Sequence, residues 1–185
     1  MKRILWPVSA LLLLSFLATA VVAQRRDRDP LTEKEVDEMR EAADYPNKRL
    51  ELMVSFTRAR IAIIDQLRAD PTAAATRPKQ IHNLLEDFIL LLDETDDNID
   101  MYASHKSDMR KGLKLLIEAD SEWQLKLRQL KEQSPPDELS QYSFALINAI
   151  DTVNDSAQNA RETLEEQNKL AQAKQLNKDY SQRKD

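Results

Sequence analysis

The chain contains no cysteine and only one glycine among its 185 residues. Without cysteine it forms no disulfide, and an N-terminus anchored through a lipid-modified cysteine is excluded. Phosphate-binding loops and dinucleotide-binding fingerprints need several glycines, so both are excluded too. Sheets joined by tight turns need residues that accept a positive φ, and Gly112 alone serves such a fold poorly. These absences favour a helical fold stabilised by packing.

Residues suited to enzymatic chemistry are equally scarce. The only histidines are His82 and His105, and no serine lies in the glycine-flanked turn of a hydrolase nucleophile. His82 precedes Glu86 by one helical turn, which predicts a surface pair. We therefore expect a protein that is not an enzyme and that uses no cofactor.

The charge balance excludes a second group of functions. The chain has 27 Lys and Arg against 32 Asp and Glu, a net charge of −5 at pH 7. An acidic surface repels nucleic acid and anionic membranes, so neither is an expected partner.

The first 23 residues are arranged as a secretory signal. Lys2 and Arg3 precede a largely apolar run from Ile4 to Ala23 that ends in small residues. Cleavage after Ala23, or alternatively after Ala20, would place the mature chain in the periplasm or outside the cell, without stable membrane insertion. An uncleaved anchor is the alternative, because the run is about as long as a membrane-spanning helix and the arginines after it resist translocation.

Prolines divide the remaining chain into segments whose apolar residues recur at helical spacing. Four long amphipathic helices are predicted, starting near Pro46, Pro78, Met109 and Pro136. Each has one apolar stripe that needs a partner. The stripes are Leu50, Met53, Val54, Ile61, Ile64 and Leu67; Ile81, Leu84, Leu85, Phe88, Leu92, Ile99 and Tyr102; Met109, Leu113, Leu116, Trp123, Leu127 and Leu130; and Leu139, Tyr142, Leu146, Ile150, Val153, Ala157, Ala160 and Leu164.

The predicted fold class is all-α, with a signal peptide at 1–23, a linker at 24–30, a helical bundle domain at 31–176 and a disordered tail at 177–185. Two architectures remain open, because no glycine or proline interrupts residues 103–108. One helix across residues 79–132 would give an elongated, spectrin-like molecule. If Ser104 or Ser107 instead caps a new helix, the chain closes into a compact four-helix bundle. The polar sequence of the join favours the compact form.

A short helix over residues 31–43 comes first, and Thr32 with Glu35 predicts a capping box at its start. The segment Leu31-Thr32-Glu33-Lys34-Glu35 resembles the Leu-Thr-x-x-Gln motif of small all-helical periplasmic chaperones related to Spy, with Glu in place of Gln. That resemblance implies binding of unfolded or envelope proteins.

The densest group of carboxylates lies in the second long helix. Asp93, Asp96, Asp97 and Asp100 fall within about a third of the helix circumference, where like charges repel. A divalent cation would relieve this repulsion, so these four residues are the candidate metal site. An exposed acidic face without metal is the simpler interpretation.

Paired Asp-x-x-x-Asp motifs such as Asp151 and Asp155 resemble those of PhoU-like metal-binding bundles, over these short stretches only. Both carboxylates lie about 160° from Val153 in the core stripe, which predicts that they face solvent.

Met101, His105 and Met109 are a second candidate metal group. They are spaced four and four and share a helix face if the helix is unbroken. Thioether and imidazole ligands suit copper(I), but the outer two residues are about 12 Å apart along the axis.

Together these observations predict an exported, non-enzymatic helical bundle with a protein-binding or structural role in the cell envelope. Self-association is expected through residues 157–176, where alanines and leucines form a seam. The alternative function is a periplasmic bundle that binds a divalent cation or copper.

Overall fold

The computed structural model describes residues 29–182. Its elements are α1 (Glu33–Glu41), α2 (Pro46–Ala69), a short 3-10 helix η2 (Pro71–Ala73), α3 (Arg77–Ser104), α4 (Arg110–Gln133) and α5 (Pro136–Gln182). No strand occurs in this part of the chain. The all-α prediction is therefore confirmed, and each long helix begins close to its predicted start. The predicted signal peptide, residues 1–23, lies outside the described residues.

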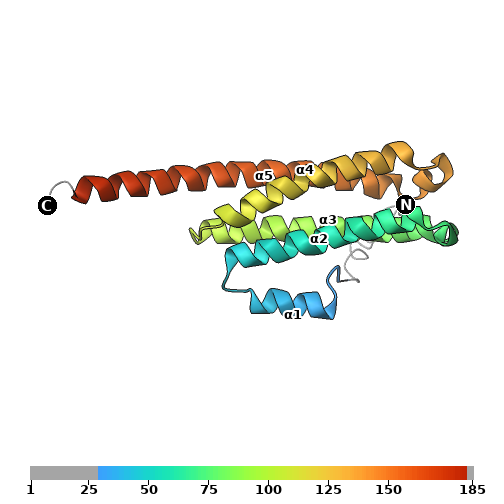
Figure 1. Ribbon diagram of the computed structural model, residues 1–185, viewed down its shortest axis with the longest axis horizontal. Helices are drawn as coiled ribbons and strands as arrows, with labels where there is room; N and C mark the ends of the chain where they lie inside the picture. The colour runs from blue at the N-terminus through green and yellow to red at the C-terminus, as the bar shows by residue number, and fades with distance from the viewer. Residues whose placement is uncertain (1–28, 183–185) are drawn as a thin grey trace, which may run out of the picture.

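Helices α2 to α5 form a four-helix bundle in which α2 contacts α3 and α4, and α5 contacts the same two helices (Figure 1). Hydrogen bonds between α2 and α4 join residues 61 to 65 positions apart. Those between α3 and α5 join residues 60 or 63 positions apart. A nearly constant offset means that α2 and α4 run in the same direction, as do α3 and α5. The bundle thus consists of two helical hairpins, α2–α3 and α4–α5. They pack so that α2 lies beside α4 and α3 lies beside α5.

The predicted apolar stripes pack into one core between these helices. Its centre includes Phe88 and Trp123, whose rings meet edge to face with centroids 5.6 Å apart. Burying a large apolar side chain contributes about 1.5–3 kcal/mol, so the stripes supply the stability that disulfides provide elsewhere.

The chain turns sharply between α3 and α4, which decides between the two predicted architectures in favour of two separate helices. Lys106 adopts a left-handed conformation with φ 56°. The amide of Ser107 donates to the carbonyl of Tyr102 at 3.0 Å, which closes the end of α3. The predicted serine cap is wrong, because Met109 is the N-cap of α4 and no side chain caps it there.

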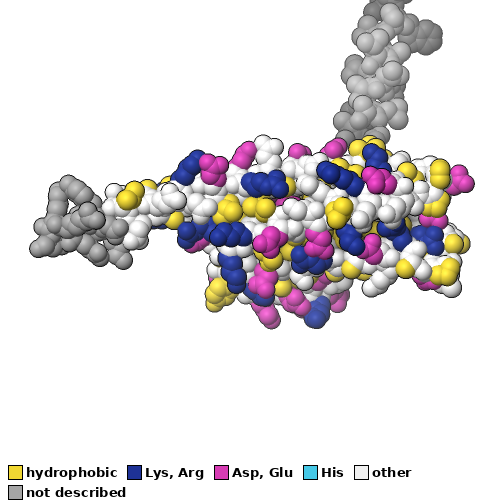
Figure 2. Space-filling view, turned by 45° about the horizontal axis from the view of Figure 1, so that its top comes forward, with side chains coloured by type: hydrophobic (Ala, Val, Ile, Leu, Met, Phe, Trp, Pro, Cys, Tyr) yellow, Lys and Arg dark blue, Asp and Glu magenta, His cyan; other side chains and the backbone are white. Residues whose placement is uncertain are grey.

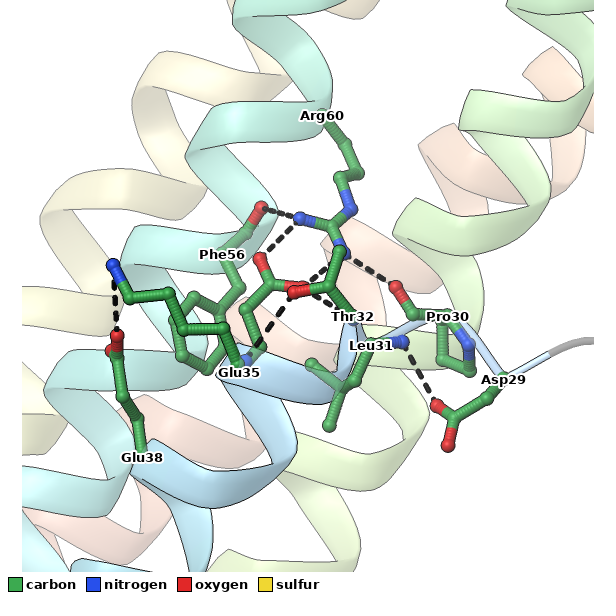
Figure 3. A network of polar contacts seen from close by, with 9 residues as sticks. Asp29, Pro30, Leu31, Thr32, Glu35, Glu38, Phe56 and Arg60 are labelled. Carbon is green, nitrogen blue, oxygen red and sulfur yellow. Dashed lines mark hydrogen bonds and ion pairs between the residues drawn. The ribbon is translucent and has the colours of Figure 1, made fainter.

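Helix α1 is held against α2 by a nearly buried ion pair (Figure 3). The predicted capping box is confirmed: Thr32 Oγ1 accepts from the Glu35 amide, and Glu35 Oε2 accepts from the Thr32 amide at 2.8 Å. The same carboxylate accepts from Arg60, with Nη2 to Oε2 at 2.7 Å. Arg60 also donates to the carbonyls of Pro30 and Phe56. One acidic side chain therefore both starts α1 and attaches it to the bundle.

Beneath α1 lies a second, smaller apolar cluster of Met39, Met53, Phe56 and Leu91. Met53 belongs to a predicted stripe, and α1 provides its cover. Within residues 29–182, no helix is both long enough and apolar enough to cross a membrane.

Helix α5 is much longer than its neighbours and extends beyond the end of the bundle (Figure 1). Residues 177–182, which we expected to belong to a disordered tail, are helical as part of α5.

Candidate functional site

The acidic run on α3 does not act as one unit in the structure. Asp93, Asp97 and Asp100 are exposed, whereas Asp96 is half-buried and turned toward α5. Asp151 and Asp155 are exposed, as their position opposite the stripe predicted. Within the described residues, no group of three or more acidic or histidine side chains is placed to share a metal ion.

Asp96 is held by two side chains of α5. Its Oδ1 accepts from Ser156 Oγ at 3.3 Å and from Asn159 Nδ2 at 3.2 Å. Ser156 is fully buried, so this contact lies at the edge of the core. The bond from Ser156 is longer than a usual O–H···O bond, and the bond from Asn159 is at the long end of the N–H···O range.

Asp120 on α4 is the most unusual polar residue of the bundle. It has 0% exposed surface, and neither of its carboxylate oxygens has a hydrogen-bond partner among the described residues. It occupies a place in the apolar stripe of α4, between Leu116 and Trp123. Polar groups this deeply buried are normally hydrogen-bonded, so this carboxylate requires a specific explanation.

The charge of Asp96 acts on Asp120. Burial, with a smaller contribution from the negative charge of Asp96, raises the pKa of Asp120 to about 7, and the charge of Arg161 acts against this rise. Burial also raises the pKa of Asp96 to about 6, against the hydrogen bonds from Asn159 and Ser156. Both acids thus lose their protons less readily than an exposed aspartate. Asp96 and Asp120, with the Ser156 and Asn159 side chains that donate to Asp96, are hereafter called the Asp96–Asp120 cluster.

The predicted copper group is not assembled. Met109 is fully buried, Met101 is 42% exposed, and His105 is exposed at the end of α3. The turn at Lys106 separates Met101 and His105 from Met109, so the three no longer share one helix.

A second candidate region is the end of α5 beyond the bundle. Gln167 ties α5 to the turn between α3 and α4: it accepts from the amide of Met109 and donates to the carbonyl of Ser107, at 2.9 Å each. Beyond it, Leu170 is 50% exposed and Leu176 is 69% exposed. Figure 2 shows scattered apolar side chains between charged ones along this part of the molecule.

A hollow of about 680 Å³ lies where this segment leaves the bundle. It is lined on one side by the turn between α3 and α4, including Lys106 and Ser107. On the other side it is lined by Leu170, Ala171 and Lys174 of α5.

Comparison with known proteins identifies no relative: no family model, no curated protein and no solved structure matches the chain. Functional arguments therefore rest on the two regions described above.

Sequence reasoning found Asp96 but missed Asp120. The signal was present, because Leu113, Leu116, Asp120, Trp123 and Leu127 keep the spacing of a core stripe with an acid in the middle. An acid at such a position is either paired or functional.

Proposed function

We propose that this protein is an exported, non-enzymatic helical bundle that acts in the cell envelope by binding protein, first of all a second copy of itself. The observation that carries the proposal is the end of α5, hereafter the α5 extension, residues 169–182. It leaves the bundle with Leu170 and Leu176 exposed.

A helix of this length has little stability in water by itself. Isolated helices shorter than about 12–15 residues are marginal, and in proteins most helical stability comes from packing of an apolar face. Within the chain, the leucines of the α5 extension are only partly covered, with Leu170 50% and Leu176 69% exposed. A partner helix would supply it.

The charges of this segment suit an antiparallel pair of two copies. If Leu170 of one copy faces Leu170 of the other, Glu166 lies opposite Lys174 in both directions. Leu164 and Leu176 are each six residues from Leu170, about 120° around the helix, so they lie beside this contact and do not extend it. The leucine contact and the opposite charges on either side of it then occur together, as in antiparallel helical pairs.

The earlier half of the predicted seam has a different role. Ala157 and Ala160 are fully buried in the core of their own chain. The proposed contact therefore narrows from residues 157–176 to residues 164–176.

The experiment is a light-scattering mass measurement on residues 24–185, on residues 24–168, and on the double variant Leu170→Glu/Leu176→Glu. We expect the first to pair in a concentration-dependent way and the other two to be single copies. Leu125→Glu is the matched control, because Leu125 is exposed on α4 away from this segment, and it should pair like the unaltered chain.

A single-copy mass for residues 24–185 at high protein concentration would contradict the pairing. Export is tested on the full-length chain expressed in a bacterium: the form recovered outside the cytoplasm should begin at Gln24. A chain retaining Met1 would contradict cleavage.

A further inference from the structure

In the Asp96–Asp120 cluster, nothing in the described structure bonds to the buried carboxylate of Asp120. Asp120 is completely buried and its two oxygens have no hydrogen-bond donor among the described residues. An ionised carboxylate in that state is strongly disfavoured unless a cation or a proton neutralises it.

Trp123 Nε1, one turn further along α4, is also buried without a partner among the described residues, whereas two buried polar side chains of α3 are satisfied within their own helix. Thr95 Oγ1 donates to the carbonyl of Leu91 at 2.6 Å, and Asn98 Nδ2 donates to the carbonyl of Glu94 at 2.6 Å. Neither of them donates to Asp120. The exposed Arg161 of α5 acts on Asp120 through its charge, but the two carboxylate oxygens still have no donor among the described residues.

The surrounding chemistry selects the kind of ligand. Asp96 and Asp120 come from α3 and α4 and are close enough for their charges to interact. Two carboxylates balance the charge of one divalent ion, and an oxygen-only set suits hard cations rather than zinc or copper. Asp96 is half-buried, so water can complete the coordination on its open side.

We propose that Asp96 and Asp120 together bind one hard divalent cation, Mg²⁺, Ca²⁺ or Mn²⁺, inside the bundle between α3, α4 and α5. Ser156 and Asn159 act as positioning residues, because their bonds to Asp96 Oδ1 hold that carboxylate against α5. The site differs from the run predicted by sequence, since Asp93, Asp97 and Asp100 are exposed. It is independent of pairing through the α5 extension.

Trp123 gives a direct probe of this site. It lies one turn after Asp120 on α4, about 4.5 Å further along the axis, and residues 24–185 contain no other tryptophan. Tb³⁺, which replaces hard divalent ions, should emit when Trp123 is excited selectively. Mg²⁺, Ca²⁺ or Mn²⁺ should displace it and quench that emission.

Thermal unfolding of the same protein at pH ~8, where both carboxylates are ionised, gives an independent readout. At about a hundred times Kd, one of the three ions should raise Tm by roughly 5–10 °C over NaCl of equal ionic strength. Asp120→Asn keeps the shape of the side chain and should abolish both the Tb³⁺ emission and the Tm shift. Asp97→Asn/Asp100→Asn removes two exposed carboxylates of the same run and should preserve both signals.

Two results would overturn the site. One is the absence of both signals in the unaltered chain, which would leave a proton as the neutralising partner. The other is loss of the signals in Asp97→Asn/Asp100→Asn together with their retention in Asp120→Asn, which would move the ion to the surface of α3. If Asp120→Asn does not fold, Asp96→Asn takes its place, because Asp96 lies at the edge of the core.

Discussion

Among single residues, Asp120 departs furthest from the environment of an ordinary carboxyl. Its pKa in the folded chain is about 7, against 3.8 for an exposed aspartate, mainly because of burial. Without divalent ions, the folded state then keeps between pH ~4 and ~7 a proton that the unfolded chain has released. The free energy of unfolding should therefore fall as pH rises through this window, by at most about 4 kcal/mol. Urea unfolding in EDTA at several pH values measures the slope.

Other charged groups near Asp120 also affect how the free energy of unfolding depends on pH, so control variants are needed to separate their contributions. Asp96 on α3 has a raised pKa of about 6 and contributes a slope of the same sign, while Arg161 on α5 opposes it. Asp120→Asn should remove most of the slope and leave the part due to Asp96 and to Asp93, whose pKa is also raised by burial and by the charge of Asp97. Asp151→Asn, exposed on α5, should leave the slope unchanged. Equal slopes in Asp120→Asn and the unaltered chain would show that Asp120 is already ionised at low pH.

Residue patterns predict which side chains are buried better than they predict which ones meet. The stripe spacing placed Leu116 and Trp123 in the core, and the same spacing includes Asp120. That Asp120 interacts with Asp96 depends on how α3 and α4 are positioned around α5. This position follows from packing between helices, which a single sequence does not reveal.

At the scale of elements, the closeness of α2 and α4 depends on the only glycine. A Cβ added to Gly112 would lie 2.8 Å from Leu50 Cβ and 2.9 Å from Leu50 Cδ1. Leu50 Cβ is fixed to its backbone, so the helices must separate. Gly112→Ala gains about 1 kcal/mol in helix propensity but overpacks a buried site, and we expect a net loss of about 1–2 kcal/mol.

Chemical denaturation compares Gly112→Ala with Lys111→Ala, which adds no atom to the core because Lys111 is exposed. The control should change the free energy of unfolding by less than about 0.5 kcal/mol. A stabilised Gly112→Ala would mean that α2 and α4 separate without cost and that the close approach is incidental.

Helix starts could be predicted because prolines mark them: Pro46 and Pro78 lie in the first turn of α2 and α3. The end of α3 lacked such a marker. There Lys106 takes the left-handed conformation that glycine usually provides, so the turn is specified by tertiary packing. For the same reason, the sequence left one helix or two open over residues 79–132.

For the whole molecule, α2 pairs with α4 and α3 with α5 at an offset of about sixty residues, so the bundle is made of two similar hairpins. The first hairpin ends with α3 at Ser104, whereas α5 continues far past the equivalent point. This asymmetry separates a part of α5 that builds the core from a part that is available for binding. Stability and binding should therefore be separable by truncation.

A chain that ends after Asn168 keeps Gln167 and its bonds to Ser107 and Met109. At concentrations too low for pairing, its free energy of unfolding should match that of residues 24–185 to within about 1 kcal/mol. A chain that ends after Asp155 loses the buried Ser156, Ala157 and Ala160 and uncovers the core beside α3 and α4. We expect it to lose more than about 3 kcal/mol or to fail to fold. Because the second cut also deletes both α5 partners of Asp96, only the first can test pairing without disturbing the Asp96–Asp120 cluster. Equal destabilisation by both cuts would mean that the α5 extension supports the fold of its own chain.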